Sequence, residues 1–434
     1  MTARSTIFGE EGTEFLRRMA DFGAGLRACF EGSGFACFTG LGPALPVLAA
    51  GKPGIAQQLY RGIFAFAGHT IDCQPAQVFS ILPPSAAWAD RLHGFAWLAH
   101  LEAPGLALYR NFARCLIQNW AGRRLRSSFE ASCRRLISLS LHSGFLLKDS
   151  SPCFQAQFLA LVSRETLRLA KLRPRTPAAQ LRQSIAVLTA GLAFRGGGTL
   201  RNDALARTAA LMTAFVLPDG GLADRSPKSL LDLLSDLVPL RAALEDQRIA
   251  IPRELNAAIE RAIPMLRMLC HGDGGLAVFH GVEHTNPAGV RAIFERDGVL
   301  GRPHSHAVYS GYCRMNQGHS TVIVDCGPPS ICDSGLAFEF SEGPQRIVGS
   351  CGVPANASPA WRAAAQSPAA HSTLQWEDKP AQNIQSILGR KMRRAKPAPI
   401  AELAISNHGT LFKAGNASPA TGLGHLHVRE LFLA

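Results

Sequence analysis

The chain contains two regions whose apolar residues repeat with different periods. Between about Ala87 and Cys270, apolar residues recur every three or four positions, which is the spacing of one buried helix face. Gly, Pro and Ser breaks divide this region, so the pattern predicts helices near 86–101, 104–121, 127–146, 151–172, 177–194, 202–216, 228–245 and 252–269. Helices of this length and spacing indicate serial antiparallel hairpins, without a repeat that aligns residue by residue.

After Gly272 the apolar runs become short, and turn clusters such as Asp273-Gly274-Gly275 separate them. This pattern is typical of antiparallel strands joined by hairpin connections. We expect the strands at Leu276–Phe279, Val290–Phe294, Ala307–Arg314, Ser320–Val324, Gly335–Phe340, Gln345–Val348 and His371–Trp376. The stretch from Asp378 to Pro399 is expected to be a solvated loop that carries a basic cluster.

The two patterns together predict a multidomain α+β protein. Residues 1–85 are expected to form an irregular, partly helical segment, residues 86–272 a helical domain, and residues 273–434 a β domain.

Composition narrows the class of protein and of partner. With 47% hydrophobic residues and 45 Lys+Arg against 32 Asp+Glu, the chain is too apolar for a disordered protein and too charged for a membrane bundle. The net charge of +13 favours a polyanionic partner such as an acidic polysaccharide. We expect no nucleic acid partner, because no binding motif accompanies the charge, and no membrane-spanning segment.

The cysteines and the first residues bear on the compartment. Eleven cysteines form no CxxC pair and no regular framework, so most are expected to be reduced and buried. The first 25 residues carry four acidic residues and match no signal peptide.

Several segments, in this order, resemble one known family. The run from His304 to Leu374, with SGYCRMNQGHSTVIVDCGPPS, GLAFEFSEGPQRIVGSCG and WRAAAQSPAAHSTL, resembles the C-terminal sandwich of heparinase II/III-type polysaccharide lyases. Upstream, RGIFAFAG, LHGFAWLAHL, RRLISLSLHSGFLL, LPDGG and HGDGGLAVF are similar to the helical domain of the bacterial branch of that family. The resemblance covers nearly the whole chain.

This resemblance implies an (α/α) toroid-like helical domain followed by an antiparallel β-sandwich. It also implies β-elimination on an acidic glycan, in which a uronate carboxylate is neutralised, a base removes the C5 proton and the glycosidic oxygen leaves. A non-catalytic, glycan-binding member of the same family is the alternative. The family implies a cell-envelope or periplasmic protein, whereas the missing export signal leaves a cytoplasmic one open. The sequence does not identify the glycan.

The resemblance suggests candidates for the chemical roles. Tyr312 is the candidate base, which requires a depressed pKa that Arg314, His304 or His306 could supply, and Arg314 and His304 are also candidates for substrate binding. A structural tyrosine is the alternative.

Three further candidates lie in or near the helical region. Arg225 could meet a carboxylate with both of its terminal nitrogens, or be an ordinary arginine at a helix start beside Ser226. His271, a catalytic candidate, and His280, a substrate-binding candidate, lie where the helical and β regions join; capping or core roles are the alternatives.

The sequence departs from the family at its working residues. Ser330 and Cys332 stand where well-studied members carry two histidines, and Leu222 and Ser226 stand where the bacterial branch carries His and Asn. Of the family's zinc ligands only His371 remains, since Ser350 replaces an aspartate. Cys332 or Cys351 could complete a thiolate site with His371, but we expect no metal and no required cofactor.

The chain also ends earlier than family members do. We expect an incomplete sandwich, whose open edge a second copy of the chain could cover.

Overall fold

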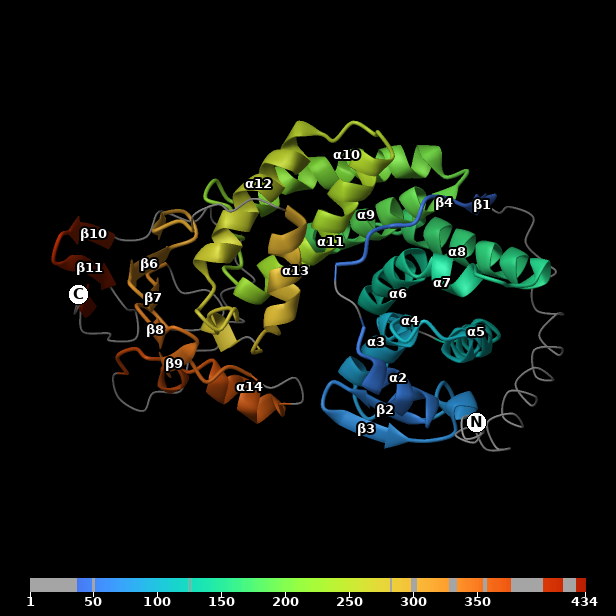
Figure 1. Ribbon diagram of the computed structural model, residues 1–434, viewed down its shortest axis with the longest axis horizontal. Helices are drawn as coiled ribbons and strands as arrows, with labels where there is room; N and C mark the ends of the chain where they lie inside the picture. Colours follow the sequence, from blue (N-terminus) through green and yellow to red (C-terminus); the bar gives the residue numbers. More distant parts are fainter. Residues whose placement is uncertain are drawn as a thin grey trace, which may run out of the picture. The chain divides into compact units, whose positions relative to one another are not determined.

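The computed structural model describes residues 37–48, 51–123, 125, 127–281, 283–297, 303–327, 334–353, 357–375, 401–416 and 427–434. These residues form helices in the first part of the chain and antiparallel sheets in the second (Figure 1), which confirms the predicted fold class. Two compact units result, one of residues up to Thr208 with Asp246–Arg248, the other of Ala209–Glu245 with Ile249–Ala434. The predicted domain boundaries stay a prediction.

The first unit is mainly helical. Its helices are α2 (Pro53–Tyr60), α3 (Ala86–His93), α4 (Leu98–Glu102), α5 (Ala107–Ala121), α6 (Phe129–Leu141), α7 (Ser143–Leu147), α8 (Pro152–Lys171) and α9 (Pro177–Ala193), and α10 (Gly198–Phe215) begins in it. Helix α6 packs against α8 and α9. The hydroxyls of Ser128, Ser151 and Thr176 accept N–H hydrogen bonds at the starts of these three helices, which explains where each begins.

The described residues of the first unit also form two small strand pairs. Strands β2 (Ile63–Phe66) and β3 (His69–Asp72) form a hairpin, whereas β1 (Gly40–Leu41) pairs with β4 (Phe194–Arg195), far along the chain. The expected helix over 86–101 is two helices, because Phe95 adopts a left-handed φ of 58° between them.

The second unit combines helices with two antiparallel sheets. Its helices are α11 (Pro227–Asp246), α12 (Arg253–Met268), α13 (Pro287–Asp297) and the short α14 (Pro359–Ala365). The larger sheet has the order β5-β6-β7-β8-β9, with strands His306–Ala307, Tyr312–Gln317, Ser320–Asp325, Phe338–Glu342 and Gln345–Val348. The smaller sheet has the order β10-β11-β12, with strands Ala401–Ser406, Gly409–Asn416 and His427–Leu433.

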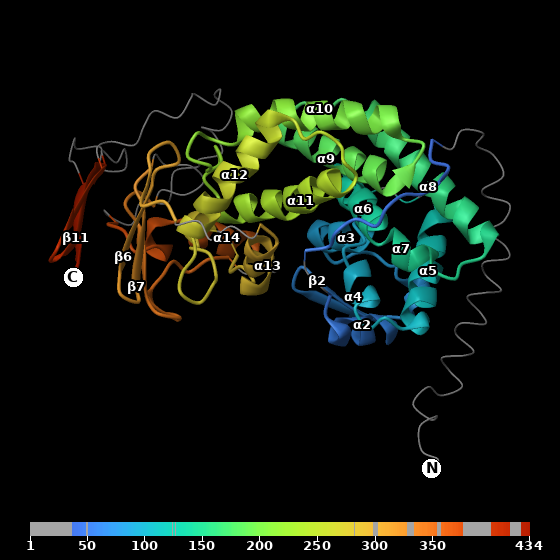
Figure 2. The same cartoon turned by 45° about the horizontal axis from the view of Figure 1, so that its top comes forward.

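The two sheets of the second unit share one hydrophobic core. Met315 and Val324 from the larger sheet pack with Phe412 and Ala414 from the smaller one, and Leu431 joins them. Figure 2 shows strand β11 next to strands β6 and β7. The residues of this core come from both sheets.

Three expected strands are wrong. Val290–Phe294 lies in helix α13, because Val290 and Ile293 are buried at a helical spacing of three, which a short apolar run does not distinguish from a strand. Leu276–Phe279 contributes a single bridge at Leu276, and residues 371–375 form no strand. Trp376 and the expected basic loop from Asp378 to Pro399 lie outside the described residues.

Candidate functional site

Tyr312, at the start of strand β6, lies in a buried cluster with Arg225 and His280. The Tyr312 hydroxyl donates a hydrogen bond to the backbone carbonyl of Arg225, and His280 Nε2 lies 3.0 Å from the same hydroxyl oxygen. Asp325, directly opposite Tyr312 on β7, pairs with the Arg225 guanidinium and lies 3.3 Å from His280 Nε2. All four residues are at most 5% exposed, so the cluster is closed to solvent.

The electrostatics of this cluster oppose a catalytic tyrosine. Burial holds the pKa of Tyr312 well above its ordinary value, although the Arg225 charge works in the other direction. The expected depression of its pKa by Arg314, His304 or His306 is therefore wrong, because burial dominates and the positive charge that opposes it is that of Arg225. Burial and the Arg225 charge also hold the pKa of His280 well below its ordinary value, so its ring is neutral.

The guanidinium of Arg225 contacts a backbone carbonyl, a carboxylate and an aromatic ring. Its Nε donates to the Ser310 carbonyl at 2.7 Å, its Nη2 pairs with Asp325, and its guanidinium carbon lies 5.2 Å from the centre of the Tyr312 ring. A Cβ added to Gly327 would lie 2.3 Å from the guanidinium, which shows how closely the backbone packs there. Burial disfavours its charge, but the Asp325 carboxylate outweighs this and raises the pKa of Arg225.

Two members of the cluster have strained backbones. Arg225 has a φ of 56° and His280 a φ of 64°, in the left-handed region that side chains other than glycine rarely adopt. Strain of this kind persists only where the surrounding contacts determine the conformation. The hydrogen bonds of the cluster therefore fix the backbone as well as the side chains.

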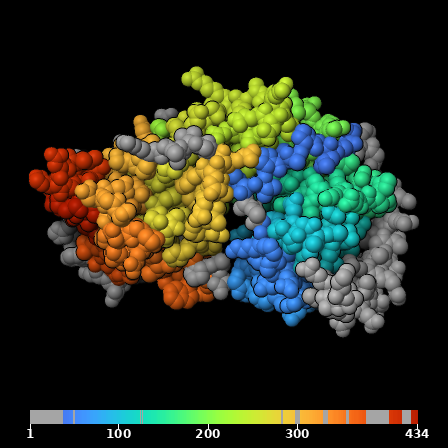
Figure 3. Space-filling view, viewed as in Figure 1, coloured from blue at the N-terminus to red at the C-terminus, as the bar shows by residue number. Residues whose placement is uncertain are grey.

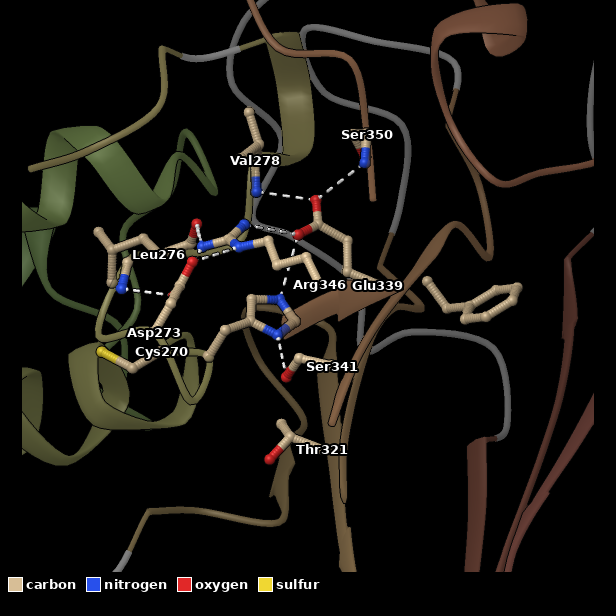
Figure 4. Close-up of polar contacts among 12 residues, drawn as sticks. Cys270, Asp273, Leu276, Val278, Thr321, Glu339, Ser341, Arg346 and Ser350 are labelled. Atoms are coloured by element: carbon tan, nitrogen blue, oxygen red, sulfur yellow. Dashed lines mark hydrogen bonds and ion pairs between the residues drawn. The ribbon is translucent and has the colours of Figure 1, made fainter. Parts of the chain in front are cut away.

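A second buried cluster centres on Glu339 of strand β8 (Figure 4). Its Oε1 accepts the N–H groups of Val278 at 2.8 Å and Ser350 at 3.4 Å, and its Oε2 lies 3.1 Å from His271 Nε2 and 3.3 Å from Arg346 Nη1. The other His271 nitrogen, Nδ1, lies 2.9 Å from the Ser341 hydroxyl. His271, predicted to be catalytic, thus has both nitrogens engaged, and its side chain is fully buried.

Arg346 extends this cluster to the turn after helix α12. It binds Asp273 with Nε at 2.9 Å and Nη2 at 3.2 Å, and Nη2 also donates to the Leu276 carbonyl at 3.0 Å. Partial burial works against ionisation of Asp273, but the hydrogen bonds from Arg346 and the Gly275 N–H lower its pKa. The HGDGG turn is therefore a structural connection to strands β8 and β9.

The two predicted substrate-binding residues on the β5–β6 side lie apart from both clusters. Arg314 donates from Nη1 to the Met268 carbonyl at 2.9 Å and to the Cys270 carbonyl, so it closes the end of helix α12. His304 is half-buried before strand β5. The structure does not bring either side chain to Tyr312.

Among the described residues, those around His371 do not make up a zinc site. The His371 ring is buried, and neither of its nitrogens has a partner in ordinary hydrogen-bond geometry among the described residues, although the Ala365 backbone lies close enough to favour the protonated ring. The hydroxyl of Ser350 is buried without a partner in the same way and supplies no charge for a metal. Cys332 lies outside the described residues, Cys351 is exposed, and among the described residues no group of three His, Cys, Asp or Glu side chains could hold an ion.

Sequence reasoning missed one exposed aromatic residue close to Tyr312. Tyr309 is 51% exposed at the tip of the turn between β5 and β6. The Asp219 carboxylate holds this turn, since its Oδ2 accepts the N–H groups of Tyr309 and Ser310 at 2.7 Å each and the Ser310 hydroxyl at 3.1 Å. These hydrogen bonds fix the backbone of the turn, so the exposed Tyr309 ring is held in place and accessible.

Asp325, Glu339 and Arg346 were also missed. The sequence did carry a signal for the two carboxylates, since Asp325 in VIVD and Glu339 in AFEF stand beside apolar strand residues. Burial of an unpaired charge there would cost free energy, so each carboxylate needs a partner. Together, the two clusters offer a substrate no accessible tyrosine or histidine, and their two arginines are already paired with carboxylates.

Comparison with known proteins identifies relatives of parts of the chain. Residues 300–434 match a family model described as heparinase II/III-like, C-terminal. FtsZ-localized protein C of Caulobacter vibrioides (strain NA1000 / CB15N) is 34% identical over 288 residues, which are 63% of this chain and 50% of that protein. The chain thus spans about half the length of this curated relative.

Solved structures share the fold at low sequence identity. Heparinase III superposes with a TM-score of 0.67 at 13% identity, over 98% of this chain and 76% of that one. The heparan sulfate lyase HepC of Pedobacter heparinus superposes with a TM-score of 0.56 at 15% identity, over 97% of this chain and 72% of that one. Identities this low speak for the fold alone.

Proposed function

This chain belongs to the heparinase II/III-like family, which its residues 300–434 match, and on that premise we propose that it binds an acidic polysaccharide without cleaving it. The observation that carries the proposal is the closure of the Tyr312 cluster. A base for β-elimination must reach the C5 proton of a bound uronate, within hydrogen-bond distance or through one water. Tyr312, Arg225 and His280 are at most 5% exposed and bind one another.

Charge supports a polyanionic glycan as the ligand. The net charge of +13 attracts sulfated or uronate-containing chains and repels other cations. Lyase activity is the alternative function, since heparinase III and the heparan sulfate lyase HepC share the fold.

Tyr309 is the residue that we assign to sugar contact. A rigid, exposed aromatic ring gives a sugar ring an apolar face at little entropic cost, and its hydroxyl offers a hydrogen bond. The Asp219 carboxylate does not contact the sugar in this proposal; it only holds the turn that carries Tyr309.

One assay separates binding from cleavage. The chain is incubated with heparan-type, chondroitin-type, alginate and bacterial acidic polysaccharides, while ultraviolet absorbance reports unsaturated uronate ends and calorimetry reports binding. We expect binding that weakens with salt, and no absorbance change. Tyr309→Ala should weaken binding about tenfold, as for a contact residue at the centre of an interface, whereas Tyr309→Phe should retain most of it.

Tyr312→Phe is the matched control, because it changes the buried tyrosine three residues away. It should leave glycan affinity unchanged. An ultraviolet signal from the parent chain that Tyr312→Phe abolishes would establish the lyase instead, and absence of binding to every glycan would remove both functions.

A second candidate function comes from the curated relative. FtsZ-localized protein C is named for its localisation with FtsZ, and it is 34% identical over 288 residues. We propose that this chain also localises with FtsZ; the cell-envelope location that the family suggests is the competing proposal. No helix among the described residues is long and apolar enough to cross a membrane. Imaging of a fluorescent fusion beside labelled FtsZ, together with cell fractionation, distinguishes the two locations.

A further inference from the structure

The small sheet β10-β11-β12 has one face in the core and one face exposed. Leu403, Phe412 and Leu431 lie in register across the three strands and face the larger sheet. Because side chains alternate along a strand, their neighbours in each strand point to the opposite face. In the space-filling view this sheet, coloured red, lies at the rim of its unit beside the orange strands (Figure 3).

The exposed face carries two rows of residues, each running across the three strands. The first row is apolar, with Ala404 opposite Leu411 and Leu411 opposite Phe432. Leu411 is 39% exposed and Phe432 59% exposed. Contiguous exposed apolar residues of this kind mark interaction surfaces.

The second row is charged with alternating sign. Glu402 lies opposite Lys413, and Lys413 lies opposite Glu430. The Lys413 Nζ and a Glu430 carboxylate oxygen are 2.5 Å apart. The charged row and the apolar row are two residues apart along each strand, so they lie side by side on the same face.

We infer that this face binds the same face of a second copy of the chain. A two-fold axis parallel to the strands, above the gap between β11 and β12, places β11 of one copy over β12 of the other. Residue positions along the strands are unchanged by that rotation. Leu411 then faces Phe432 of the partner copy, and Lys413 faces Glu430 of the partner copy.

Charge complementarity selects a second copy as the occupant. The two-fold axis satisfies both rows at once: each copy contributes one Lys413–Glu430 contact and one Leu411–Phe432 contact to the pair. Self-complementary patches of this type form the isologous interfaces of two-fold dimers. Sheets that pack face to face lie about 10 Å apart, a spacing that leucine and phenylalanine side chains fill.

Charge reversal tests the pairing. Lys413→Glu places like charges at both facing positions of a homodimer, and Glu430→Lys does the same with opposite sign. Each single variant should weaken self-association about tenfold or more, because facing like charges repel across an interface. A mixture of the two variants restores opposite charges at both positions, so it should form heterodimers.

The measurement is sedimentation velocity of the full chain over a concentration range, with a fluorescent label on one variant for the mixture. Phe432→Ser should also weaken the dimer, while circular dichroism checks that every variant folds. A parent chain that stays monomeric at the highest concentration overturns the inference. Single variants that dimerise like the parent, or a mixture that stays monomeric when the parent dimerises, overturn it equally.

Discussion

Glu339 and His371 are both buried ionisable residues of the second unit, and their surroundings differ in hydrogen bonding. Both Glu339 oxygens have partners, from two side chains and two backbone N–H groups. His371 has only the nearby Ala365 backbone, outside ordinary hydrogen-bond geometry, and among the described residues the buried hydroxyls of Ser334 and Ser350 have no partner. A buried polar group with partners holds a structure together, whereas one without partners costs free energy.

This difference in hydrogen bonding indicates that the Glu339 cluster stabilises the fold, whereas the buried groups around His371 do not. The Glu339 cluster connects a helix end, a turn and two strands of the second unit. His371 stands where the family resemblance implies a zinc ligand, and the hydroxyl of Ser350, at another such position, is buried without a partner among the described residues. The two regions should therefore respond to mutation with opposite signs.

Removal of the Glu339 carboxylate should have the largest effect. Glu339→Ala leaves His271, Arg346 and two backbone N–H groups without their acceptor in a buried site. We expect the free energy of unfolding to fall by about 3–5 kcal/mol, as when one partner of a buried ion pair is lost. Urea denaturation measures the change, and Glu245→Gln, on the exposed end of helix α11, should stay within about 0.5 kcal/mol of the parent. Equal losses of unfolding free energy in Glu339→Ala and Glu245→Gln would contradict a stabilising role of the Glu339 cluster.

Stability should depend on pH through the buried histidines. Burial lowers the pKa of His371, although the Asp325 and Glu339 carboxylates and the Ala365 backbone oppose it. Below the ordinary histidine pKa of 6.5 the unfolded chain takes up a proton that folded His371 refuses, so stability is lost as pH falls below that value. The loss is about 1.4 kcal/mol per pH unit for each such histidine, until its folded pKa is reached.

His371→Leu should therefore reduce the slope of unfolding free energy against pH below 6.5, while the slope above 7 stays the same. The remaining slope belongs in part to His280, whose pKa lies well below the ordinary value. Parallel curves for the variant and the parent would show that His371 titrates normally in the folded chain.

Tyr312→Phe tests the buried hydroxyl of the other cluster. The substitution removes the donor to the Arg225 carbonyl and the contact with His280. We expect a loss of about 1–2 kcal/mol in the free energy of unfolding, the usual consequence of leaving a buried acceptor unpaired. Tyr309→Phe, at the exposed turn, should cause no measurable loss in the free energy of unfolding. A larger loss for Tyr309→Phe than for Tyr312→Phe would contradict the structural role of Tyr312.

Ser334→Ala should have the smallest effect, with the opposite sign. The Ser334 hydroxyl is buried and unpartnered among the described residues, so its removal relieves a desolvation cost. We expect the unfolding free energy to rise by up to about 1 kcal/mol. A loss of similar size in thermal and urea unfolding would mean that the hydroxyl has a partner.

Sequence periodicity was sufficient for the long helices, but not for helix α13 or for all strands. Long segments such as α8 and α9 repeat their apolar face several times, and each begins at a Ser or Thr cap. The strands β10 and β11 were not predicted, because AELAIS and GTLFKAGN mix alanine, glycine and charged residues with few large apolar side chains. Their burial depends on contacts with the larger sheet, which no local pattern records.

Three residues of the Tyr312 cluster could be predicted from the sequence, but their burial and protonation states could not. The sequence singled out Tyr312, Arg225 and His280, and the structure brings these three together. Their mutual burial could not be foreseen, because Asp325 approaches Arg225 across a separation of 100 residues. A buried carboxylate partner changes which protonation states are accessible, and only tertiary structure reveals it.

The pairing of strands β1 and β4 has a consequence for synthesis of the chain. Gly40 pairs with Arg195, which the ribosome adds 155 residues later. At about 5–20 residues per second, strand β1 waits roughly eight to thirty seconds for its partner. During that interval Phe38, which is 1% exposed in the folded chain, lacks the Phe194 ring, whose centre lies 5.2 Å from its own in a tilted arrangement. Strand β1 and Phe38 beside it are therefore a natural site for a chaperone to bind until strand β4 has emerged.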